Sequence, residues 1–392
     1  MEGIRKVRTA VVGCGMISNI YIRNLKNLFY IIDLAAVANR GADAARKQAE
    51  RFGIEKVMTP DEVAAADDIE LVVNLTPPAA HYDIIKKMLL SGKHVYTEKM
   101  FTTRLEDAEE LVRLADEKNL YLGVAPDTIL GAGIQTARTI IDAGLIGEIT
   151  SVQVKINRNQ SLNSEIFRFL RNDGGCLPYD VGIYYIGALL ALLGPVKSVS
   201  AFAAPAPVHP AEFLFASAPE DSWQVPGINT VAASLQFENG AVGSVLFDGN
   251  TISAEKHGFT ICGTKGILEV GDPNKFGDPV RLTLPGQEEI TFPFTHGYDG
   301  RSVFSPPEWF DGYGSRGIGV AEMAWALRTG RKNNRCSKEY GLHCMEVLTG
   351  MEKSAETGKP YAPKSRFIMD PLQPGHYSGS AAFRQDAERS LI

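Results

Sequence analysis

The stretch from Thr9 to Ser18 constrains the fold of this chain more than any other. Ala10–Val12 are small or β-branched apolar residues, typical of a central strand in a parallel sheet. Gly13 and Gly15 then occupy the first two glycine positions of the motif G-x-G-x-x-G, and Ser18 stands at the third. The first glycine permits a tight turn, and the second lets the backbone approach a diphosphate. The stretch therefore predicts a strand, a nucleotide-binding turn and a helix.

The residues that follow support a dinucleotide site. A helix over about residues 17–28 would offer its N-terminal amides and dipole to the diphosphate. The apolar run 31–38 then ends in Asn39 and Arg40, about 20 residues beyond the turn, where the motif places its ribose-binding residue. Asn39 can bond a 2′-hydroxyl and Arg40 can meet a 2′-phosphate, so we expect NAD and do not exclude NADP. The alternatives are a strand-turn-helix that only packs, and a solvated Arg40.

Bulk properties narrow the class of protein. A chain of 392 residues is too long for one ordinary core and suggests two domains. A net charge of −6 and the absence of a Lys/Arg-rich block argue against a nucleic-acid partner. Five cysteines without a C-x-x-C pair favour reduced thiols over a disulfide framework or a metal site. Without an apolar N-terminal region or a long apolar run, we expect a cytoplasmic protein with no membrane partner.

Up to residue 125, predicted strands alternate with predicted helices. The strands are 31–38, 69–75, 94–97 and 121–125, and the helices are 42–52, a short one from residue 60, 81–91 and 105–118. This order predicts a doubly wound parallel sheet. Ligands bind such sheets at the carboxyl ends of the strands. The rule selects one rim of residues: Gly13–Ser18, Asn39-Arg40, Thr76–Pro78, Glu98-Lys99 and Pro126-Asp127.

Beyond residue 149 the pattern changes to short alternating runs. Strands are expected at 149–157, 196–203, 230–237, 241–247, 259–262, 267–270 and 280–284, and helices include 134–143, 177–193 and 319–328. Glu238-Asn239-Gly240 predicts a hairpin. The fold class is thus α/β, with a nucleotide-binding domain built on a doubly wound parallel sheet (1–126), a second domain with a mostly antiparallel sheet and a few helices (127–370), and a tail or arm (371–392).

Lys99 is the leading candidate for proton transfer. It follows the strand 94–97 on the rim where a nicotinamide would lie, and Glu98 can orient it or contact the cofactor. Partial desolvation beside a positive ring is expected to lower the pKa of Lys99 and suit it to exchange a proton with a hydroxyl. The alternative is a surface ion pair. Thr76 and His81 lie where the rim would meet the cofactor, although His81 is equally suited to a helix start bound to backbone.

The combination of motifs resembles the Gfo/Idh/MocA family of oxidoreductases. The resemblance rests on Val11-Val-Gly-Cys-Gly-Met-Ile17, Asn74-Leu-Thr-Pro-Pro78 with His81, Glu98-Lys99, Leu145-Ile-Gly-Glu-Ile149, and Gly174-Gly175 leading to Asp180. It implies a Rossmann domain (1–126) followed by a substrate-binding and oligomerisation domain with an open, mostly antiparallel sheet (127–370). It also implies hydride transfer at a sugar or polyol carbinol, and assembly into a dimer or tetramer through the open sheet faces. The cofactor-binding residues expected are Gly13, Gly15, Met16, Ile17, Asn39, Arg40, Thr76, His81, Glu98 and Lys99.

Two positions depart from the family pattern. Glu98-Lys99 is followed by Met100 where the family has proline, and the family's Asp-x-x-x-His becomes Asp180 to Tyr184. The i, i+4 spacing puts Asp180 and Tyr184 on one helix face. A tyrosine there can donate or relay a proton, but a reference pKa near 10 makes it a poor base unless Lys99 or the cofactor lowers it. The alternatives are a pocket-wall Tyr184 and a helix-capping Asp180.

Other residues are candidates for a moved base or for substrate contacts. His296, in the loop Phe292–Tyr298, is the candidate for a displaced base, against a structural role. Asp127, Arg158 and Arg316 are candidates for binding substrate hydroxyls, together with Asp180, Tyr184 and His296; loop anchors or surface ion pairs are the alternatives for the arginines.

The departures resemble a subgroup of the family that includes glycoside 3-oxidases, which oxidise the C3 hydroxyl of a glucosyl unit. The leading hypothesis is an NAD(P)-dependent sugar or glycoside oxidoreductase, in which Lys99 with Asp180 accepts the hydroxyl proton. A redox-assisted glycosidase with retained NAD is an alternative on the same scaffold. A non-catalytic sugar- or nucleotide-binding module stays open because the family's histidine and proline are missing.

Overall fold

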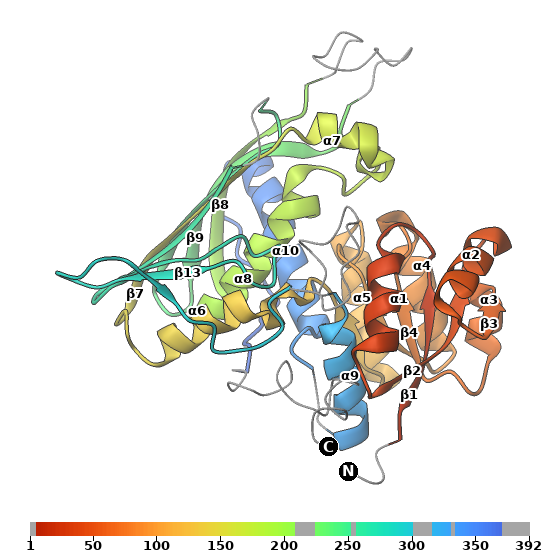
Figure 1. The fold of residues 1–392 in the computed structure, drawn as a ribbon. Helices are drawn as coiled ribbons and strands as arrows, with labels where there is room; N and C mark the ends of the chain where they lie inside the picture. Colours follow the sequence, from red (N-terminus) through yellow and green to blue (C-terminus); the bar gives the residue numbers. More distant parts are fainter. Residues whose placement is uncertain (1–4, 208–223, 252–255, 301–315, 331–333, 371–392) are drawn as a thin grey trace, which may run out of the picture.

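The computed structural model describes residues 5–207, 224–251, 256–300, 316–330 and 334–370, which form two sheets with their helices (Figure 1). The predicted α/β fold, a parallel Rossmann sheet followed by a mostly antiparallel sheet, is confirmed. The predicted tail, 371–392, lies outside the described residues.

The first sheet has six parallel strands in the order β3-β2-β1-β4-β5-β6. Their bounds are β1 Val7–Val12, β2 Ile32–Ala38, β3 Lys56–Met58, β4 Leu71–Asn74, β5 His94–Thr97 and β6 Leu122–Val124. The strand order reverses between β1 and β4. Such sheets bind ligands beside the carboxyl ends of the strands where the order reverses, which here are β1 and β4.

The helices of this sheet agree with the sequence pattern. They are α1 Ser18–Asn27, α2 Ala42–Phe52, α3 Pro60–Ala65, α4 His81–Leu90 and α5 Leu105–Glu117. Gly53 ends α2 with a φ of +61°, and Thr59 begins α3 with a reciprocal capping box to Glu62. The short edge strand β3 was not predicted, since its three residues are only partly buried or exposed and carry no buried apolar pattern.

The second sheet has eight strands in the order β14-β13-β12-β11-β7-β10-β9-β8. Only β7 and β10 pair in parallel; the other neighbours are antiparallel. The predicted hairpin at 238–240 joins β9 to β10. The bounds are β7 Ile149–Asn157, β8 Val196–Pro205, β9 Ile228–Phe237, β10 Val242–Asp248, β11 Lys256–Gly263, β12 Ile267–Glu269, β13 Val280–Thr283 and β14 Ile290–Phe292, of which β14 was not predicted.

Helices cover one face of the second sheet. Figure 1 shows α6 (Ala132–Asp142), α8 (Ile183–Leu193) and α10 (Lys338–Thr357) between this sheet and the first domain. Every residue of α8 is buried, which suits a helix that is apolar all round and packed on every side. None of the helices in the described ranges is long and apolar enough to cross a bilayer.

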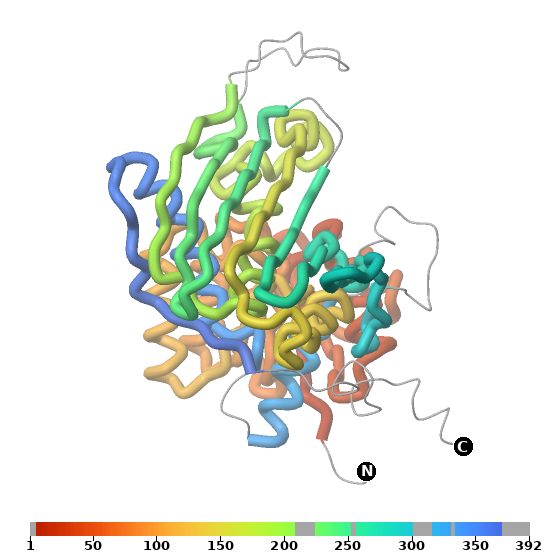
Figure 2. The backbone as a smooth tube through the Cα atoms, turned by 90° about the vertical axis from the view of Figure 1, so that its left-hand side faces the viewer, coloured from red at the N-terminus to blue at the C-terminus, as the bar shows by residue number. Residues whose placement is uncertain are grey.

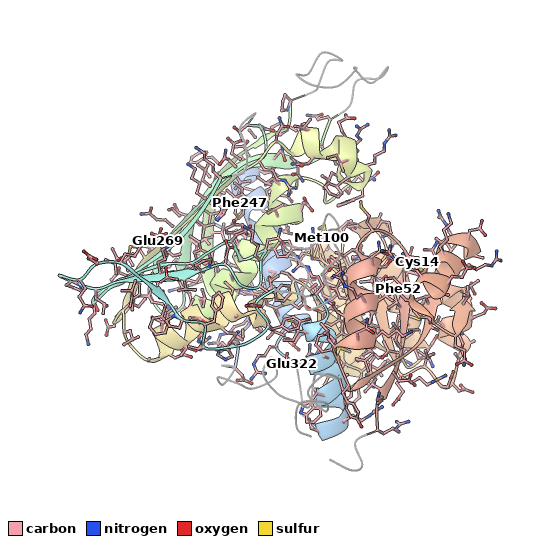
Figure 3. The ribbon with its side chains drawn as sticks, in the orientation of Figure 1. Cys14, Phe52, Met100, Phe247, Glu269 and Glu322 are labelled. Atoms are coloured by element: carbon pink, nitrogen blue, oxygen red, sulfur yellow. The ribbon has the colours of Figure 1, made fainter. Side chains whose placement is uncertain are left out.

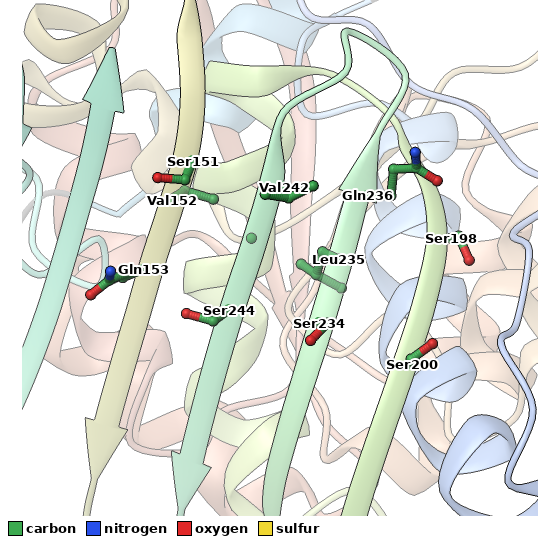
Figure 4. Close-up of a pocket in the computed structure, with 11 residues that line it drawn as sticks. Ser151, Val152, Gln153, Ser198, Ser200, Ser234, Leu235, Gln236, Val242 and Ser244 are labelled. Atoms are coloured by element: carbon green, nitrogen blue, oxygen red, sulfur yellow. The ribbon is translucent and has the colours of Figure 1, made fainter. Parts of the chain in front are cut away.

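The other face of the second sheet is open. Figure 2 views it directly, and no helix of the described residues lies over it. Phe202 of β8, 85% exposed, lies in register with Ala232 of β9, which in turn faces Leu246 of β10. Beside this row, serine and glutamine side chains line a shallow groove (Figure 4): Ser151, Gln153, Ser198, Ser200, Ser234, Gln236 and Ser244. No carboxyl, histidine or cysteine side chain lines this groove.

The last two described helices return to the first domain. The amide of Val124 in β6 donates to the carbonyl of Cys336, just before α10. A Cβ on Gly341 of α10 would lie 2.5 Å from the Cβ of Val124, so only glycine permits this close approach. The glycines at 341 and 350 weaken the helical signal, and α10 was not predicted. The segment after residue 316, assigned above to the second domain, thus packs on both.

A buried ion pair fixes α9 (Ile318–Thr329) to the segment that leads into α10. The carboxylate of Glu322, fully buried on α9, accepts from the backbone N–H of Arg335 at 2.9 Å and pairs with the Arg335 guanidinium. The Nε of Arg335 also donates to the carbonyl of Asp370 at 2.7 Å. One arginine therefore satisfies a buried charge and ties down the end of the described chain.

We expect Arg335→Ala to lower the free energy of unfolding by about 3–5 kcal/mol, because it leaves the Glu322 carboxylate buried without its cation. Urea unfolding followed by circular dichroism measures this loss. The matched control is Arg366→Ala, which breaks the exposed ion pair with Glu238 and should leave the unfolding midpoint nearly unchanged. Equal losses in both variants would contradict the special cost of the buried pair.

Candidate active site

The glycine-rich turn joins β1 to α1 as the motif requires. Gly13 has a φ of +106°, and a Cβ there would lie 2.5 Å from the carbonyl carbon of Leu75 at the end of β4. Its amide donates to the carbonyl of Ala38 at the end of β2. Gly13 is therefore demanded both by its backbone conformation and by the packing of three strand ends.

Neither backbone conformation nor packing requires glycine at position 15, since a Cβ there would meet no atom within 4 Å. Helix α1, which is described in full, has no acidic residue in its first turn and no side-chain hydrogen bond at its N-cap, Ile17. The neighbouring Met16 is 49% exposed. An open approach to an uncapped helix N-terminus suits a diphosphate, so these residues fit the predicted dinucleotide.

Asn39 lies against this turn. Its Oδ1 accepts from the amide of Cys14 at 3.3 Å, and its Nδ2 donates to the carbonyl of Gly41 at 3.1 Å. Arg40 beside it is exposed. The predicted ribose-binding residues thus adjoin the glycine-rich turn, and Asn39 also braces its backbone.

His81 holds two rim loops together. Its Nδ1 lies 2.7 Å from the carbonyl oxygen of Met100, and its Nε2 lies 2.8 Å from that of Thr76. Burial lowers the pKa of His81, against the raising effect of these two carbonyls. The hydroxyl of Thr76 in turn donates to Asn74 Oδ1 at 2.8 Å. The structural role left open for His81 is therefore present, while its contact with a cofactor stays a prediction.

Lys99 reaches across to the second domain. Its Nζ lies 2.7 Å from both the carbonyl oxygen and the Oδ1 of Asp180, which belongs to the π-helical turn Pro178–Gly182 before α8. The two side chains are only 16% and 10% exposed. Met100, the next residue, lies between the two sheets (Figure 3). The rim of the first sheet and the second domain therefore meet at this ion pair.

In the protein alone the pKa of Lys99 is raised, and its lowering beside a positive nicotinamide stays a prediction. Burial does lower the pKa of Lys99, but the Asp180 carboxylate, with smaller effects of Tyr184 and Glu98, raises it above its ordinary value. For Asp180, burial raises the pKa, yet Lys99 and Arg158 bring it below its ordinary value. The pair thus rests as ammonium and carboxylate.

The second oxygen of Asp180 is held by a residue that was not predicted. Gln160, buried at the start of α7 (Gln160–Ile166), donates from Nε2 to Asp180 Oδ2 at 3.0 Å and to the carbonyl of Gly175 at 2.8 Å. Arg158 Nη1 lies 3.9 Å from the same carboxylate oxygen. A Cβ on Gly175 would lie 2.0 Å from the carbonyl oxygen of Leu170, which explains the glycine there.

Tyr184 lies close to two cations. Its ring centroid is 5.5 Å from Lys99 Nζ and 5.2 Å from Arg316 Cζ, and its hydroxyl accepts from Arg316 Nη2 at 3.2 Å. Burial raises the pKa of Tyr184 more than Arg316 and Lys99 lower it. The lowered pKa that a base role for Tyr184 would need is therefore not found, and the phenol stays neutral.

The carboxylates of two rim residues, Glu98 and Asp127, accept hydrogen bonds from backbone amides. The Glu98 carboxylate accepts from the hydroxyl of Tyr21 at 2.7 Å and from the amide of Lys99 at 3.0 Å. Asp127 Oδ2 accepts from the amides of Gly317 and Gly319 at 2.8 and 3.1 Å, which anchors the start of α9. Burial raises the pKa of Asp127 to about 6. Glu98 thus orients the Lys99 backbone, and contact of Asp127 with substrate stays a prediction.

His296 contacts its neighbour Thr295, which lies against α6. It is buried, and its Nδ1 lies 2.8 Å from the hydroxyl of Thr295. Thr295 itself contacts Thr136 and Thr139 of α6. The structure thus gathers Lys99, Asp180, Tyr184, Arg158 and Arg316 into one cluster, while the base role of His296 stays a prediction.

Both parts of this fold match known families. Residues 7–125 match the Gfo/Idh/MocA oxidoreductase family, NAD-binding Rossmann fold, and residues 134–269 match the GFO/IDH/MocA C-terminal domain.

Two curated relatives align with part of the chain. An uncharacterized oxidoreductase of Schizosaccharomyces pombe is 34% identical over 200 residues, 50% of this chain and 54% of that protein. The dTDP-3,4-didehydro-2,6-dideoxy-alpha-D-glucose 3-reductase of Streptomyces violaceoruber is 30% identical over 196 residues, 49% of this chain and 56% of that enzyme. The chain thus spans about half the length of these relatives.

A solved structure shares the whole architecture. Levoglucosan dehydrogenase in complex with NADH and levoglucosan superposes with a TM-score of 0.76 at 19% identity, covering 92% of this chain and 100% of that one. At this identity the likeness concerns the fold. Because both domains match their family models in the expected order, this chain belongs to the Gfo/Idh/MocA family of oxidoreductases.

Proposed function

We propose that this protein is an NAD(P)-dependent oxidoreductase that acts on a secondary hydroxyl of a sugar or glycoside. The observation that carries the proposal is the buried Lys99–Asp180 pair, which lies at the carboxyl end of β5 where the two domains meet. A titratable pair on this edge of a parallel sheet is suited to proton transfer at a bound ligand.

The glycine-rich turn and Asn39 would hold the dinucleotide, with NAD preferred and NADP allowed by the exposed Arg40. When bound, the nicotinamide supplies the hydride acceptor or donor. Both domains would enclose the sugar, because Lys99 comes from the first and Asp180, Tyr184 and Arg158 come from the second.

Lys99 is the group that would exchange the hydroxyl proton. In the direction of reduction its ammonium donates a proton to the new hydroxyl oxygen. In the direction of oxidation its neutral amine accepts that proton, and Asp180 stabilises the ammonium that forms. Gln160 and Arg158 keep the Asp180 carboxylate in place. Tyr184, neutral and buried, forms the wall beside Lys99.

For the position of oxidation we propose C3 of a glucoside, which would give a 3-keto sugar. The support is the motif resemblance together with the relative whose name specifies reduction at position 3 of a dTDP sugar. Incubation with NAD and a panel of glucosides tests this, with NADH followed by absorbance and the keto sugar located by NMR. Steady formation of NADH would distinguish this activity from a redox-assisted glycosidase, which cleaves the glycoside without net reduction.

Lys99→Ala should lower kcat by roughly 10²-fold or more, because a positioned acid or base contributes roughly 10²- to 10⁴-fold. The Kd for NADH should change little, because the glycine-rich turn that would hold the diphosphate does not include Lys99. Steady-state kinetics and NADH fluorescence titration measure the two quantities.

Lys86→Ala, which removes a surface lysine paired with Glu110, is the control and should keep full activity. Near-normal turnover by Lys99→Ala would remove Lys99 from the chemistry.

The pH dependence of oxidation should reflect the Lys99–Asp180 pair. Oxidation needs the neutral amine, and the pKa of Lys99 is raised, so kcat should still be rising with pH in the alkaline range. Asp180→Asn removes the main cause of that upward shift, so burial then dominates and the rise should move to lower pH. Profiles of kcat against pH for both proteins test this, with Asp142→Asn as a surface control. An unmoved profile in Asp180→Asn contradicts the assignment.

We further propose that the open face of the second sheet joins copies of this chain into a dimer or tetramer. Phe202 and Leu246 are exposed on it, and the neighbouring groove is lined by uncharged side chains (Figure 4). Light scattering after gel filtration should show an oligomer, and Phe202→Glu should shift the mass toward a monomer. Leu90→Glu, at an exposed apolar residue of α4, is the control. A monomeric wild-type protein would contradict this interface.

A further inference from the structure

Arg316 is a buried cation whose charge is not compensated by contact. Arg316 is only 4% exposed. The hydrogen bonds that its guanidinium donates go to uncharged oxygens: the Tyr184 hydroxyl at 3.2 Å, and the Oδ1 and carbonyl of Asn274 at 2.8 and 3.5 Å. Its Nη1 has no hydrogen-bond partner among the described residues.

The two carboxylates that act electrostatically on Arg316 bind other groups, although Asp127 Oδ1 has no hydrogen-bond partner among the described residues. Asp127 binds the amides of Gly317 and Gly319, and Glu98 binds Tyr21 and the amide of Lys99. Burial lowers the pKa of Arg316, but Tyr184, Asp127 and Glu98 raise it above its ordinary value, so the guanidinium stays charged. A buried charge without a contacting counter-ion is costly, and an anionic ligand would remove that cost.

The guanidinium is also held rigidly. It stacks on the rings of Tyr184 and Phe276, with Cζ 5.2 and 5.3 Å from their centroids. Asn274 accepts hydrogen bonds from this guanidinium, and its own backbone N–H donates to Asp272 Oδ1 at 3.0 Å. An arginine that is positioned by neutral partners keeps its charge available to a ligand.

Arg316 and Lys99 both lie against the ring of Tyr184, with Arg316 Cζ 5.2 Å and Lys99 Nζ 5.5 Å from its centroid. We infer that the substrate is a sugar that carries an anionic group, a carboxylate or a phosphate, and that Arg316 binds this group while Lys99 meets the reacting hydroxyl. This inference rests on the proposed oxidoreductase activity and narrows its substrate class. The carboxamide of a nicotinamide is the competing partner, but it is neutral and would leave the charge uncompensated.

The test compares matched sugars: methyl glucoside, methyl glucuronoside and methyl glucoside 6-phosphate. In the wild-type protein kcat/KM should be roughly 10- to 100-fold higher for an anionic member than for the neutral one, as a charge-assisted hydrogen bond contributes. Arg316→Gln should bring the ratio close to one. Arg138→Gln, which removes a more exposed arginine of α6, is the control for net charge. Whether the carboxylate or the phosphate is preferred identifies the anion.

A second variant covers the case in which Arg316→Gln does not fold. Asn274→Asp keeps the arginine and places a carboxylate where an amide oxygen now lies 2.8 Å from Nη2. It should abolish the preference for the anionic sugar in the same way. Equal kcat/KM for neutral and anionic sugars in the wild-type protein would overturn the inference and leave the oxidoreductase proposal standing.

Two further outcomes distinguish a failure of this inference from a failure of the proposed function. If Arg316→Gln weakens NADH binding by more than about tenfold while the sugar preference persists, Arg316 belongs to the cofactor and the inference fails. If none of the sugars is oxidised, the proposed function fails for this panel. Isothermal titration of D-glucuronate, D-glucose 6-phosphate and D-glucose in the presence of NADH then decides the inference by binding alone, and equal affinities would overturn it.

Discussion

The site depends on one ion pair between the two domains. Lys99 follows a strand of the parallel sheet, and Asp180 stands on the turn that precedes the buried helix α8. Each group alone would be destabilised in its charged form by burial, and each is kept charged by the other. The pair therefore fixes how the rim of the Rossmann sheet meets the second domain, and it keeps a proton donor at that junction.

The rest of the chain supports this junction through backbone contacts. Gln160 donates hydrogen bonds to Asp180 Oδ2 and to the carbonyl of Gly175, and the Glu98 carboxylate accepts from the backbone amide of Lys99. Asp127 fixes the start of α9, and Arg316, which directly precedes this helix, contacts Tyr184. The site is thus assembled from segments separated by more than 200 residues, each held by a side chain that binds main-chain atoms.

The part of this arrangement that sequence predicts is the part encoded locally. The turn at Gly13 and Gly15 and the position of Lys99 after a strand follow from residue type and spacing. Gln160 does not, since a glutamine at the start of a short helix carries no signal until folding brings it to Asp180. The raised pKa of Lys99 in the protein alone was not foreseen for the same reason: burial is foreseeable from position, but the carboxylate that outweighs it lies 81 residues away. Helix α10 was missed because the glycines that let it approach β6 also lower its helix propensity.

The two cations beside Tyr184 differ in how their charge is balanced. The Lys99 ammonium has the Asp180 carboxylate at 2.7 Å, so its charge is neutralised within the protein. What Lys99 can offer a substrate is therefore its proton. Arg316 donates hydrogen bonds to hydroxyl, amide and carbonyl oxygens and stacks on two aromatic rings, so no carboxylate among the described residues contacts its charge. A guanidinium does not give up its proton at working pH, which makes it unsuited to acid–base chemistry and suited to binding. The ring of Tyr184 therefore adjoins both a group that can move a proton and a group that can only attract an anion.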